Sequence, residues 1–178
     1  MPKLIKDAKE TIIRQAKNLL LQEGFSGFNM RKIAESAGVA SGTLYNYFPS
    51  KDHLIVSVML EDWEAMLARI EKETPLATSA TEGFAMIFHA IHNFADLYRA
   101  TWQAFRGAAD YPWIREKYHK SLIDQLCEQI LPLGARFDFL FDPTVAPFIS
   151  EVLLTGAAHP QGEFRYLIPC LKRLVGEQ

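Results

Sequence analysis

The sequence predicts an all-α protein, with an N-terminal three-helix helix-turn-helix domain followed by a larger helical domain. Three observations predict this class. Apolar residues recur every three to four positions along nearly the whole chain of 178 residues, which is the spacing of amphipathic helices. Alternating apolar and polar runs long enough for a sheet are missing. Gly, Pro and capping residues divide the chain into roughly nine helical segments.

The first predicted helix carries an apolar stripe from Ile5 to Leu20 and stops at Gly24. Residues 25–28 form a tight apolar connection to the next element. Asn29 then caps a short helix that runs through Ala37, because its side chain can accept hydrogen bonds from the free amides of the first turn.

A second short helix is predicted at Ser41–Tyr47, after a turn in which Gly38 supplies a positive φ angle. Pro49 closes this unit, and Ser50 caps a long helix from Lys51 to about Lys72. Two helices of about two turns each are too short to be stable alone. They therefore predict a pair packed at a steep angle, which is a helix-turn-helix.

The remaining elements follow from the same signals. They are a loop at residues 74–81, a helix from Phe84 to a break at Gly107, a helix from near Pro112 to Pro132 and Gly134, a helix begun by Asp142 and Pro143, and a turn at residues 160–162. A last helix runs from Phe164 to Leu174, with Pro169 as a candidate kink. The predicted domains are residues 1–50 and residues 51–178.

The second short helix has the surface chemistry of a DNA reader. Its hydroxyl groups and its N-terminal amides suit phosphate oxygens, and Gly42 lets the backbone come close to a partner. Asn46 can read an adenine edge in the major groove. Lys51, at the start of the following helix, is predicted as a second phosphate contact.

The run from Met30 to Lys51 resembles the N-terminal DNA-binding domain of the TetR/AcrR family of bacterial transcriptional regulators. The resemblance rests on the Ala-Gly-Val turn, the Gly-Thr-Leu-Tyr core and the Tyr-Phe-Pro-Ser-Lys exit, together with the long helix that precedes them. It covers about the first 60 residues. The rest of the chain matches the family only as an all-helical region of suitable length.

The resemblance implies DNA contacts by nine residues. They are Asn29, Arg31, Ser41, Gly42, Thr43, Tyr45, Asn46, Tyr47 and Lys51. The chain departs from the family at Ala40, where a hydroxyl residue is common, at Ser41, where lysine is common, and at Asn29, which replaces a common threonine. The reading helix therefore lacks a cation and is expected to depend on hydroxyls, Asn46 and close backbone approach.

The charge is divided along the chain. Residues 1–53 hold eight Lys and Arg and five Asp and Glu, which gives a net charge of +3. Residues 54–178 hold eleven Lys and Arg and sixteen Asp and Glu, which gives −5, so the whole chain has a net charge of −2. The positive excess lies in the part expected to meet phosphates.

Several classes of protein are disfavoured. No stretch approaches the roughly 18 apolar residues of a membrane span, and residues 1–7 lack the apolar core of a secretory leader. Cys127 and Cys170 make neither a disulfide framework nor a zinc site. We therefore expect a cytoplasmic protein with no cofactor and no membrane partner.

The middle of the chain is rich in aromatic side chains, which often enclose a cavity between helices. The family resemblance implies an effector pocket here, and an apolar or aromatic ligand is favoured; a plain hydrophobic core is the alternative. The predicted ligand-binding residues are Trp63, Phe84, Phe88, His89, His92, Tyr98, Trp102, Phe105, Trp113 and Tyr118. His89 and His92 share a helix face, but further metal ligands are not evident, so no metal is expected.

One helix-turn-helix reads only one half-site, so a homodimer is expected on double-stranded operator DNA. The two last helices carry the apolar stripes for a two-fold interface, although the same stripes can face the chain's own core. The predicted interface residues are Phe148, Ile149, Val152, Leu153, Gly156, Leu167, Ile168, Leu171 and Leu174.

The leading hypothesis is a dimeric transcriptional regulator, expected to be a repressor, under the control of a small-molecule effector. A helical enzyme is the second hypothesis, but the sequence holds no nucleophile elbow, phosphate loop, dinucleotide fingerprint or metal-ligand cluster. A regulator that needs no ligand is the third.

Overall fold

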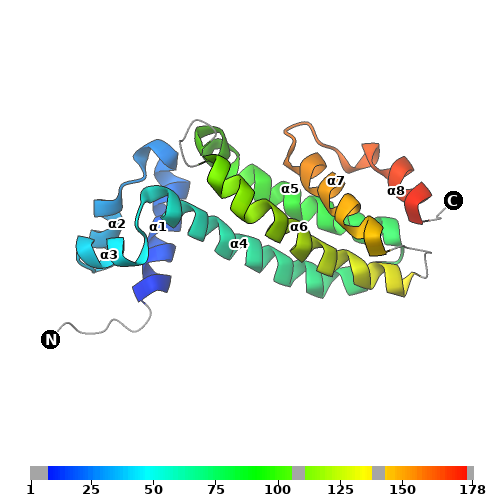
Figure 1. Ribbon diagram of the computed structural model, residues 1–178, viewed down its shortest axis with the longest axis horizontal. Helices are drawn as coiled ribbons and strands as arrows, with labels where there is room; N and C mark the ends of the chain where they lie inside the picture. Colours follow the sequence, from blue (N-terminus) through cyan, green and yellow to red (C-terminus); the bar gives the residue numbers. More distant parts are fainter. Residues whose placement is uncertain (1–7, 106–110, 138–142, 176–178) are drawn as a thin grey trace. The chain divides into compact units, whose positions relative to one another are not determined.

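The computed structural model describes residues 8–105, 111–137 and 143–175, without the side chains of residues 111–115, Pro143 and Val175. This part of the chain contains eight α-helices and three short 3₁₀ helices, and it contains no strand (Figure 1). The predicted all-α class is confirmed, and the helix count is close to the expected nine.

The described residues form two compact units. One contains those of Met1–Asp62 and Ala100–Asp110, and the other contains those of Trp63–Arg99 and Tyr111–Gln178. Helices α4 (Lys51–Glu73) and α5 (Ala80–Phe105) therefore contribute residues to both units. The boundary between residues 50 and 51 stays a prediction.

The first unit begins with α1 (Ala8–Gly27), which Gly24 interrupts with a φ of 67°. Only glycine adopts this left-handed conformation without strain, so the predicted stop at Gly24 appears as a break followed by one more turn. Helices α2 (Met30–Ser36) and α3 (Ser41–Tyr47) follow. Leu44 and Ile33 are fully withdrawn from solvent and anchor the two short helices in the core of this unit.

The turn between α2 and α3 is a Schellman motif. Gly38 has the expected positive φ of 67°. Its amide donates to the carbonyl of Glu35 at 3.1 Å, and the amide of Val39 donates to the carbonyl of Ala34 at 3.0 Å. These two bonds satisfy carbonyls that the end of a helix otherwise leaves free, and they set the direction in which α3 departs.

The second unit contains most of α5 and the helices that follow it. Those elements are α6 (Tyr111–Arg136), η2 (Pro143–Val145), α7 (Ala146–Ala158), η3 (Phe164–Tyr166) and α8 (Ile168–Val175), with η1 (Thr74–Leu76) before α5. Helix α6 packs along α7 (Figure 1). The core of the unit is built from the buried faces of these helices and the second half of α4.

Helix α6 does not end at Pro132 and Gly134, so that prediction is wrong: the helix continues to Arg136. The reason is tertiary packing. Leu133 is buried, and its two methyl groups pack directly against Gly83 of α5. A Cβ atom added to Gly83 would lie only 2.7 and 2.8 Å from these methyl carbons. This close approach of α5 and α6 holds the last turn in helical form although Pro132 cannot donate its backbone hydrogen bond.

The C-terminal region also differs from its prediction. The last helix is not continuous from Phe164 to Leu174, because η3 and α8 are separate elements. Pro169 is the second residue of α8, a position where proline costs no hydrogen bond, so it does not kink the helix. Gly107 and Asp142 lie outside the described residues.

Candidate functional site

The helix pair begins at the predicted cap. The side-chain oxygen Oδ1 of Asn29 accepts hydrogen bonds from the backbone amides of Arg31 at 2.9 Å and Lys32 at 3.2 Å. Asn29 has extended backbone angles, as the capping position of a helix requires. The prediction of an Asn29 cap is confirmed. Its side-chain oxygen is already hydrogen-bonded to two amides in the first turn of α2.

Helix α3 presents a polar face to solvent. Leu44 and the following Phe48 are buried and hold the helix against the unit. The opposite face exposes Ser41, Gly42, Tyr45, Asn46 and Tyr47, while Thr43 is half-buried. The two tyrosines expose about half of their surface, 50% for Tyr45 and 47% for Tyr47. Five of the six predicted contact residues of α3 are therefore exposed, on the side of the helix away from Leu44.

Positive charge near this face comes from α2, since α3 contains no Lys or Arg. The side chain of Arg31 is 84% exposed and pairs with Glu35 at 3.1 Å. Lys32 pairs with Glu23 at 3.0 Å. Exposed ion pairs of this kind are weak, so both cations can exchange their partner for a phosphate.

Lys51 is placed differently from the other predicted contact residues. Its ammonium donates a hydrogen bond to the backbone carbonyl of Phe25 and lies 4.0 Å from the centre of the Phe25 ring. Burial lowers the pKa of Lys51, and the neighbouring Asp52 opposes this effect. The ammonium is thus turned toward the last turn of α1.

Most of the aromatic residues predicted to bind a ligand are packed in the interior. Trp63, Phe84, Phe88, Tyr98 and Phe105 are buried, His92, Trp102 and Tyr118 are half-buried, and His89 is exposed. The side chain of Trp113 lies outside the described residues. Trp102 and Phe105 belong to the first unit, whereas the other residues of this set belong to the second.

The aromatic core of the second unit contains one notable polar contact. The Nε1 of Trp63 donates to the Oε1 of Gln125 at 2.8 Å, and the indole ring meets the edge of Phe94 at 5.4 Å. This contact ties α4 to α6 inside the unit. A buried indole usually has such a partner, so the bond is consistent with a satisfied core as well as with a ligand site.

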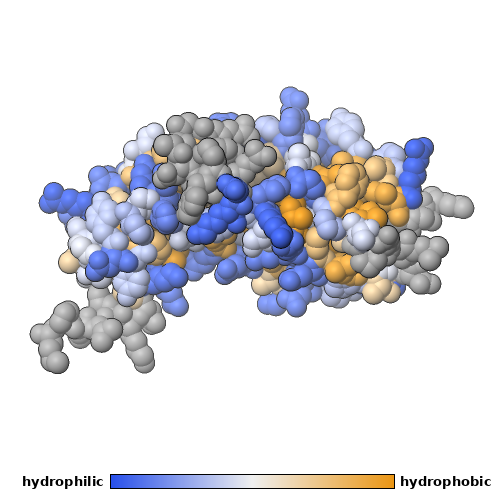
Figure 2. Space-filling model, in the orientation of Figure 1, coloured by the Kyte–Doolittle hydropathy of each residue, from blue (hydrophilic) through white to orange (hydrophobic). Residues whose placement is uncertain are grey.

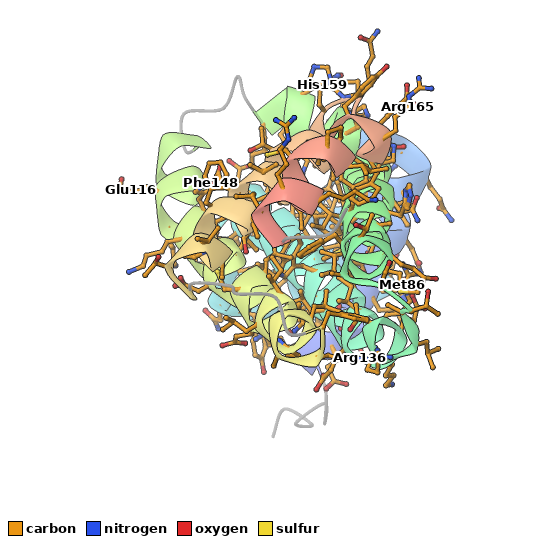
Figure 3. All side chains as sticks on the ribbon, turned by 90° about the vertical axis from the view of Figure 1, so that its right-hand side faces the viewer. Met86, Glu116, Arg136, Phe148, His159 and Arg165 are labelled. Carbon is orange, nitrogen blue, oxygen red and sulfur yellow. The ribbon has the colours of Figure 1, made fainter. Side chains whose placement is uncertain are left out.

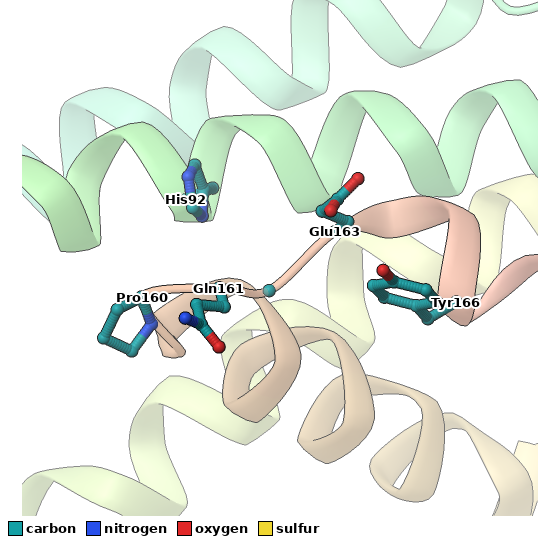
Figure 4. Close-up of a pocket in the computed structure, with 6 residues that line it drawn as sticks. His92, Pro160, Gln161, Glu163 and Tyr166 are labelled. Atoms are coloured by element: carbon teal, nitrogen blue, oxygen red, sulfur yellow. The ribbon is translucent and has the colours of Figure 1, made fainter.

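A solvent-open hollow of about 610 Å³ lies beside the turn between α7 and η3 (Figure 4). Its lining residues are His92, Pro160, Gln161, Gly162, Glu163 and Tyr166. Of the predicted ligand-binding residues, His92 takes part in this hollow. Its Nδ1 lies 2.9 Å from the carbonyl of Ala157, so the ring is fixed against the end of α7.

The predicted dimer residues divide between two faces. Ile149, Leu153 and Leu171 are buried in the chain's own core. Phe148 is 56% exposed and Leu174 is 36% exposed, while Val152, Gly156, Leu167 and Ile168 are half-buried. Hydrophobic surface gathers over α7 and α8 (Figure 2), and Phe148 lies on the outer side of α7 (Figure 3).

Two features were not predicted from the sequence, one local and one between distant segments. Ser79 caps α5 by accepting from the amide of Glu82 at 3.1 Å, while Glu82 reaches back to the amide of Thr78 at 2.6 Å. The Ser-Ala-Thr-Glu run is a capping-box pattern and signals this start. Arg99 of α5 pairs with Asp96 and donates to the carbonyl of Ala158 at 3.2 Å, a contact between distant segments that carries no sequence signal.

The described residues contain no group of three or more His, Cys, Asp or Glu side chains able to hold a metal ion. Within the same ranges, no helix combines the length and the apolar character needed to cross a membrane.

Comparison with known proteins identifies the N-terminal region. Residues 12–58 match the family model described as bacterial regulatory proteins of the tetR family. The chain carries a TetR-family N-terminal domain. The matched segment runs from α1 through the helix pair and into α4, so it contains all nine residues for which the sequence predicts DNA contacts.

The TetR-family domain accounts for the similarity to curated relatives. The HTH-type transcriptional repressor KstR of Rhodococcus jostii (strain RHA1) is 41% identical over 64 residues, which cover 36% of this chain and 30% of that protein. The fatty acid metabolism regulator protein of Bacillus subtilis (strain 168) is 32% identical over 76 residues, which cover 43% of this chain and 39% of that protein. The matches thus span between three tenths and two fifths of these two relatives.

The fold extends beyond the TetR-family domain. The structure of FadR from Bacillus subtilis in complex with stearoyl-CoA superimposes with a TM-score of 0.59 and 20% identity, covering 96% of this chain and 99% of that one. At this level of identity, the likeness shows a shared fold for the chain as a whole and no shared ligand.

Proposed function

We propose that this protein is a DNA-binding transcriptional regulator, and that it acts as a repressor on a near-palindromic operator. The observation that carries the proposal is the polar, exposed face of α3, held by buried Leu44 and Phe48 within a TetR-family domain. Such a helix fits the major groove, where its N-terminal residues meet base edges. The HTH-type repressor KstR, similar in this domain, supports the repressor assignment.

In the proposed complex, the side chains divide into two groups. Arg31, Ser41 and Thr43 contact phosphates, and Gly42 allows the backbone of α3 to approach the strand. Asn46 reads a base edge, flanked by Tyr45 and Tyr47. Asn29 caps α2 with its oxygen and keeps its side-chain amide for a phosphate. Lys51 is left out of the direct contacts because its ammonium donates to the carbonyl of Phe25.

A homodimer is proposed because two reading helices must be about 34 Å apart to meet successive half-sites. The exposed Phe148 and Leu174, with the half-buried residues beside them on α7 and α8, supply an apolar face. The two-fold operation repeats the same patch on both subunits, so a compact patch is sufficient.

An effector is proposed in the second unit, where aromatic side chains are dense. The aromatic rings of the core favour an apolar ligand, and a change of packing around Trp63 on α4 would alter the helix that also begins in the DNA-binding unit. The FadR structure holds stearoyl-CoA, so a long-chain acyl-CoA is the first compound to test. Such binding is a coupling between two sites.

DNA binding is tested by fluorescence anisotropy on duplexes from the region upstream of the protein's own gene and on random duplex. The expected result is a salt-dependent preference for the upstream DNA. Asn46→Ala should change the sequence preference, whereas Glu71→Ala, at an exposed site on α4, should leave it unchanged. A protein that binds both duplexes equally would contradict the proposal.

The effector is tested by thermal unfolding with stearoyl-CoA, free stearate and a panel of small aromatic compounds. A compound that binds the folded state raises the melting temperature by mass action. The same compound should change the affinity for the upstream DNA. A panel that leaves both quantities unchanged favours a regulator that needs no ligand.

A further inference from the structure

The side chain of Lys51 links the start of α4 to a segment 26 residues earlier in the chain. Its ammonium donates a hydrogen bond to the backbone carbonyl of Phe25. The nitrogen also lies 4.0 Å from the centre of the Phe25 ring and 5.7 Å from the centre of the Phe28 ring. One ammonium therefore contacts three groups: the carbonyl and the ring of Phe25 at the end of α1, and the ring of Phe28 just after it.

Helix ends explain why the side chain turns this way. Lys51 is the first residue of α4, where the partial positive charge of the helix N-terminus disfavours a cation. Phe25 lies in the last turn of α1, among the carbonyls that have no partner within their helix. The ammonium thus lies beside the C-terminal carbonyls of α1, which favour a cation, and away from the N-terminus of α4, which disfavours one.

The aromatic surroundings strengthen the link. Phe28 is buried, and the ring of Phe25 meets the edge of Phe105 at a centroid distance of 5.3 Å. Attraction between a cation and a ring increases when water is excluded. Lys51 is itself half-buried, and this burial lowers the pKa of its ammonium.

We propose that Lys51 is a positioning residue of the DNA-binding unit rather than a phosphate contact. It fixes the start of α4 against residues 25–28, and through that segment it orients the helix pair that follows. The proposal rests on the proposed DNA-binding function and assigns the role of one residue within it. Arg31, whose side chain is 84% exposed, is the contrasting cation that remains available to phosphates.

The first test measures the salt dependence of DNA binding. The full-length protein and its variants are titrated with a random-sequence duplex of about 30 base pairs at several KCl concentrations, because each phosphate contact adds about one to the slope of log affinity against log salt. The variants are Lys51→Met, Lys51→Arg and the control Arg31→Met. All titrations are made well below the melting temperature, so that every variant is folded.

The expected results differ between the two cations. Lys51→Met should weaken binding by about five-fold at an unchanged slope, as expected for loss of one charged hydrogen bond. Lys51→Arg should restore the affinity, since a guanidinium can donate to the same carbonyl. Arg31→Met should reduce the slope by about one. A Lys51→Met slope lower by about one would overturn the proposal.

The second test uses thermal unfolding and needs no DNA. Lys51→Met should lower the melting temperature by about 3 °C or more, and the effects of Lys51→Met and Phe25→Leu should not add in the double variant. Additive effects, or an unchanged melting temperature for Lys51→Met, would overturn the link. If the unmodified protein shows no salt-dependent binding, the proposed function fails, while this cycle still decides whether Lys51 and Phe25 are coupled.

Discussion

The backbone of Gly162 lies against the carbonyl oxygen of Gly156, so close that a Cβ atom on residue 162 would stand 1.8 Å from that oxygen. The amide of Gly162 also donates to the carbonyl of His159 at 2.9 Å. This turn returns the chain from the end of α7 to η3, and it forms one side of the hollow beside His92 (Figure 4).

Gly162→Ala is expected to destabilise the protein by about 2–4 kcal/mol, because backbone rather than a flexible side chain must move. Urea denaturation followed by circular dichroism measures the change. Gly42→Ala serves as the control, since nothing lies within 4 Å of a Cβ atom there. An unchanged midpoint for Gly162→Ala would show that the turn relaxes freely.

Gly42→Ala is expected to separate folding from DNA binding. Gly42 lies in a helix with open space around it, so alanine should stabilise the protein by about 0.5 kcal/mol. The added methyl group on the reading face should weaken binding to the upstream duplex by about five-fold or more, through loss of close approach. Thermal unfolding and anisotropy measure the two effects, and an unchanged affinity would place Gly42 outside the interface.

Asn29→Ala is expected to cost about 1 kcal/mol of stability, because two amides at the start of α2 lose their acceptor. Asn29→Asp keeps an acceptor and should retain most of that stability. Chemical denaturation of both variants measures the difference. Equal losses in both would mean that the amide group, rather than the oxygen, is the stabilising part of this side chain.

Neighbouring residues on α7 are expected to respond in opposite ways. Phe148→Asp, at a side chain that is 56% exposed, should shift the protein from dimer to monomer and leave it folded. Ile149→Ala, at a side chain with 0% exposure, should instead cost about 2–5 kcal/mol of stability. Sedimentation velocity and thermal unfolding distinguish the two effects. A Phe148→Asp protein that stays dimeric would place the interface elsewhere.

Stability is expected to fall in acid through two surface carboxylates. The pKa of Glu82 is lowered mainly by a hydrogen bond from the Thr78 side chain, and secondly by one from the Thr78 backbone amide. The pKa of Asp96 is lowered mainly by the hydrogen bond from Arg99. A lowered pKa stabilises the fold above the ordinary pKa of the carboxylate, and this contribution disappears as the pH falls through the folded-state pKa.

Glu82→Gln should therefore reduce the pH dependence of the melting temperature below about pH 4.5, which is close to the ordinary pKa of glutamate. Glu71→Gln, at an exposed site of α4, is the matched control. Parallel pH profiles for the native protein and Glu82→Gln would show that the contact with Thr78 does not contribute to acid stability.

Local signals predicted the N-terminal elements closely. The Asn29 cap, the left-handed Gly38 and the bounds Ser41–Tyr47 agree with the structure, because each depends on bonds that span a few residues. The accessible face of α3 follows from the same periodicity, since Leu44 alone of its side chains must be buried. The roles of these residues toward DNA stay predictions.

The same local rules failed at the end of α6. Pro132 and Gly134 are helix-ending signals, yet the packing of Leu133 against Gly83 outweighs them. These residues are about 50 positions apart, so no short window of sequence contains the interaction. The division of the apolar stripes on α7 and α8 between core and surface likewise depends on distant neighbours.

The sequence by itself determined the helical class, the helix-turn-helix and the family of the first domain, because period, caps and turns are encoded over short spans. Only the tertiary structure decided that Lys51 turns to Phe25, that Ile149 is buried while Phe148 is exposed, and that Gly162 meets Gly156. The physical reason is common to all three. Each depends on which surfaces lie together once the helices have packed, and helical spacing alone does not encode that arrangement.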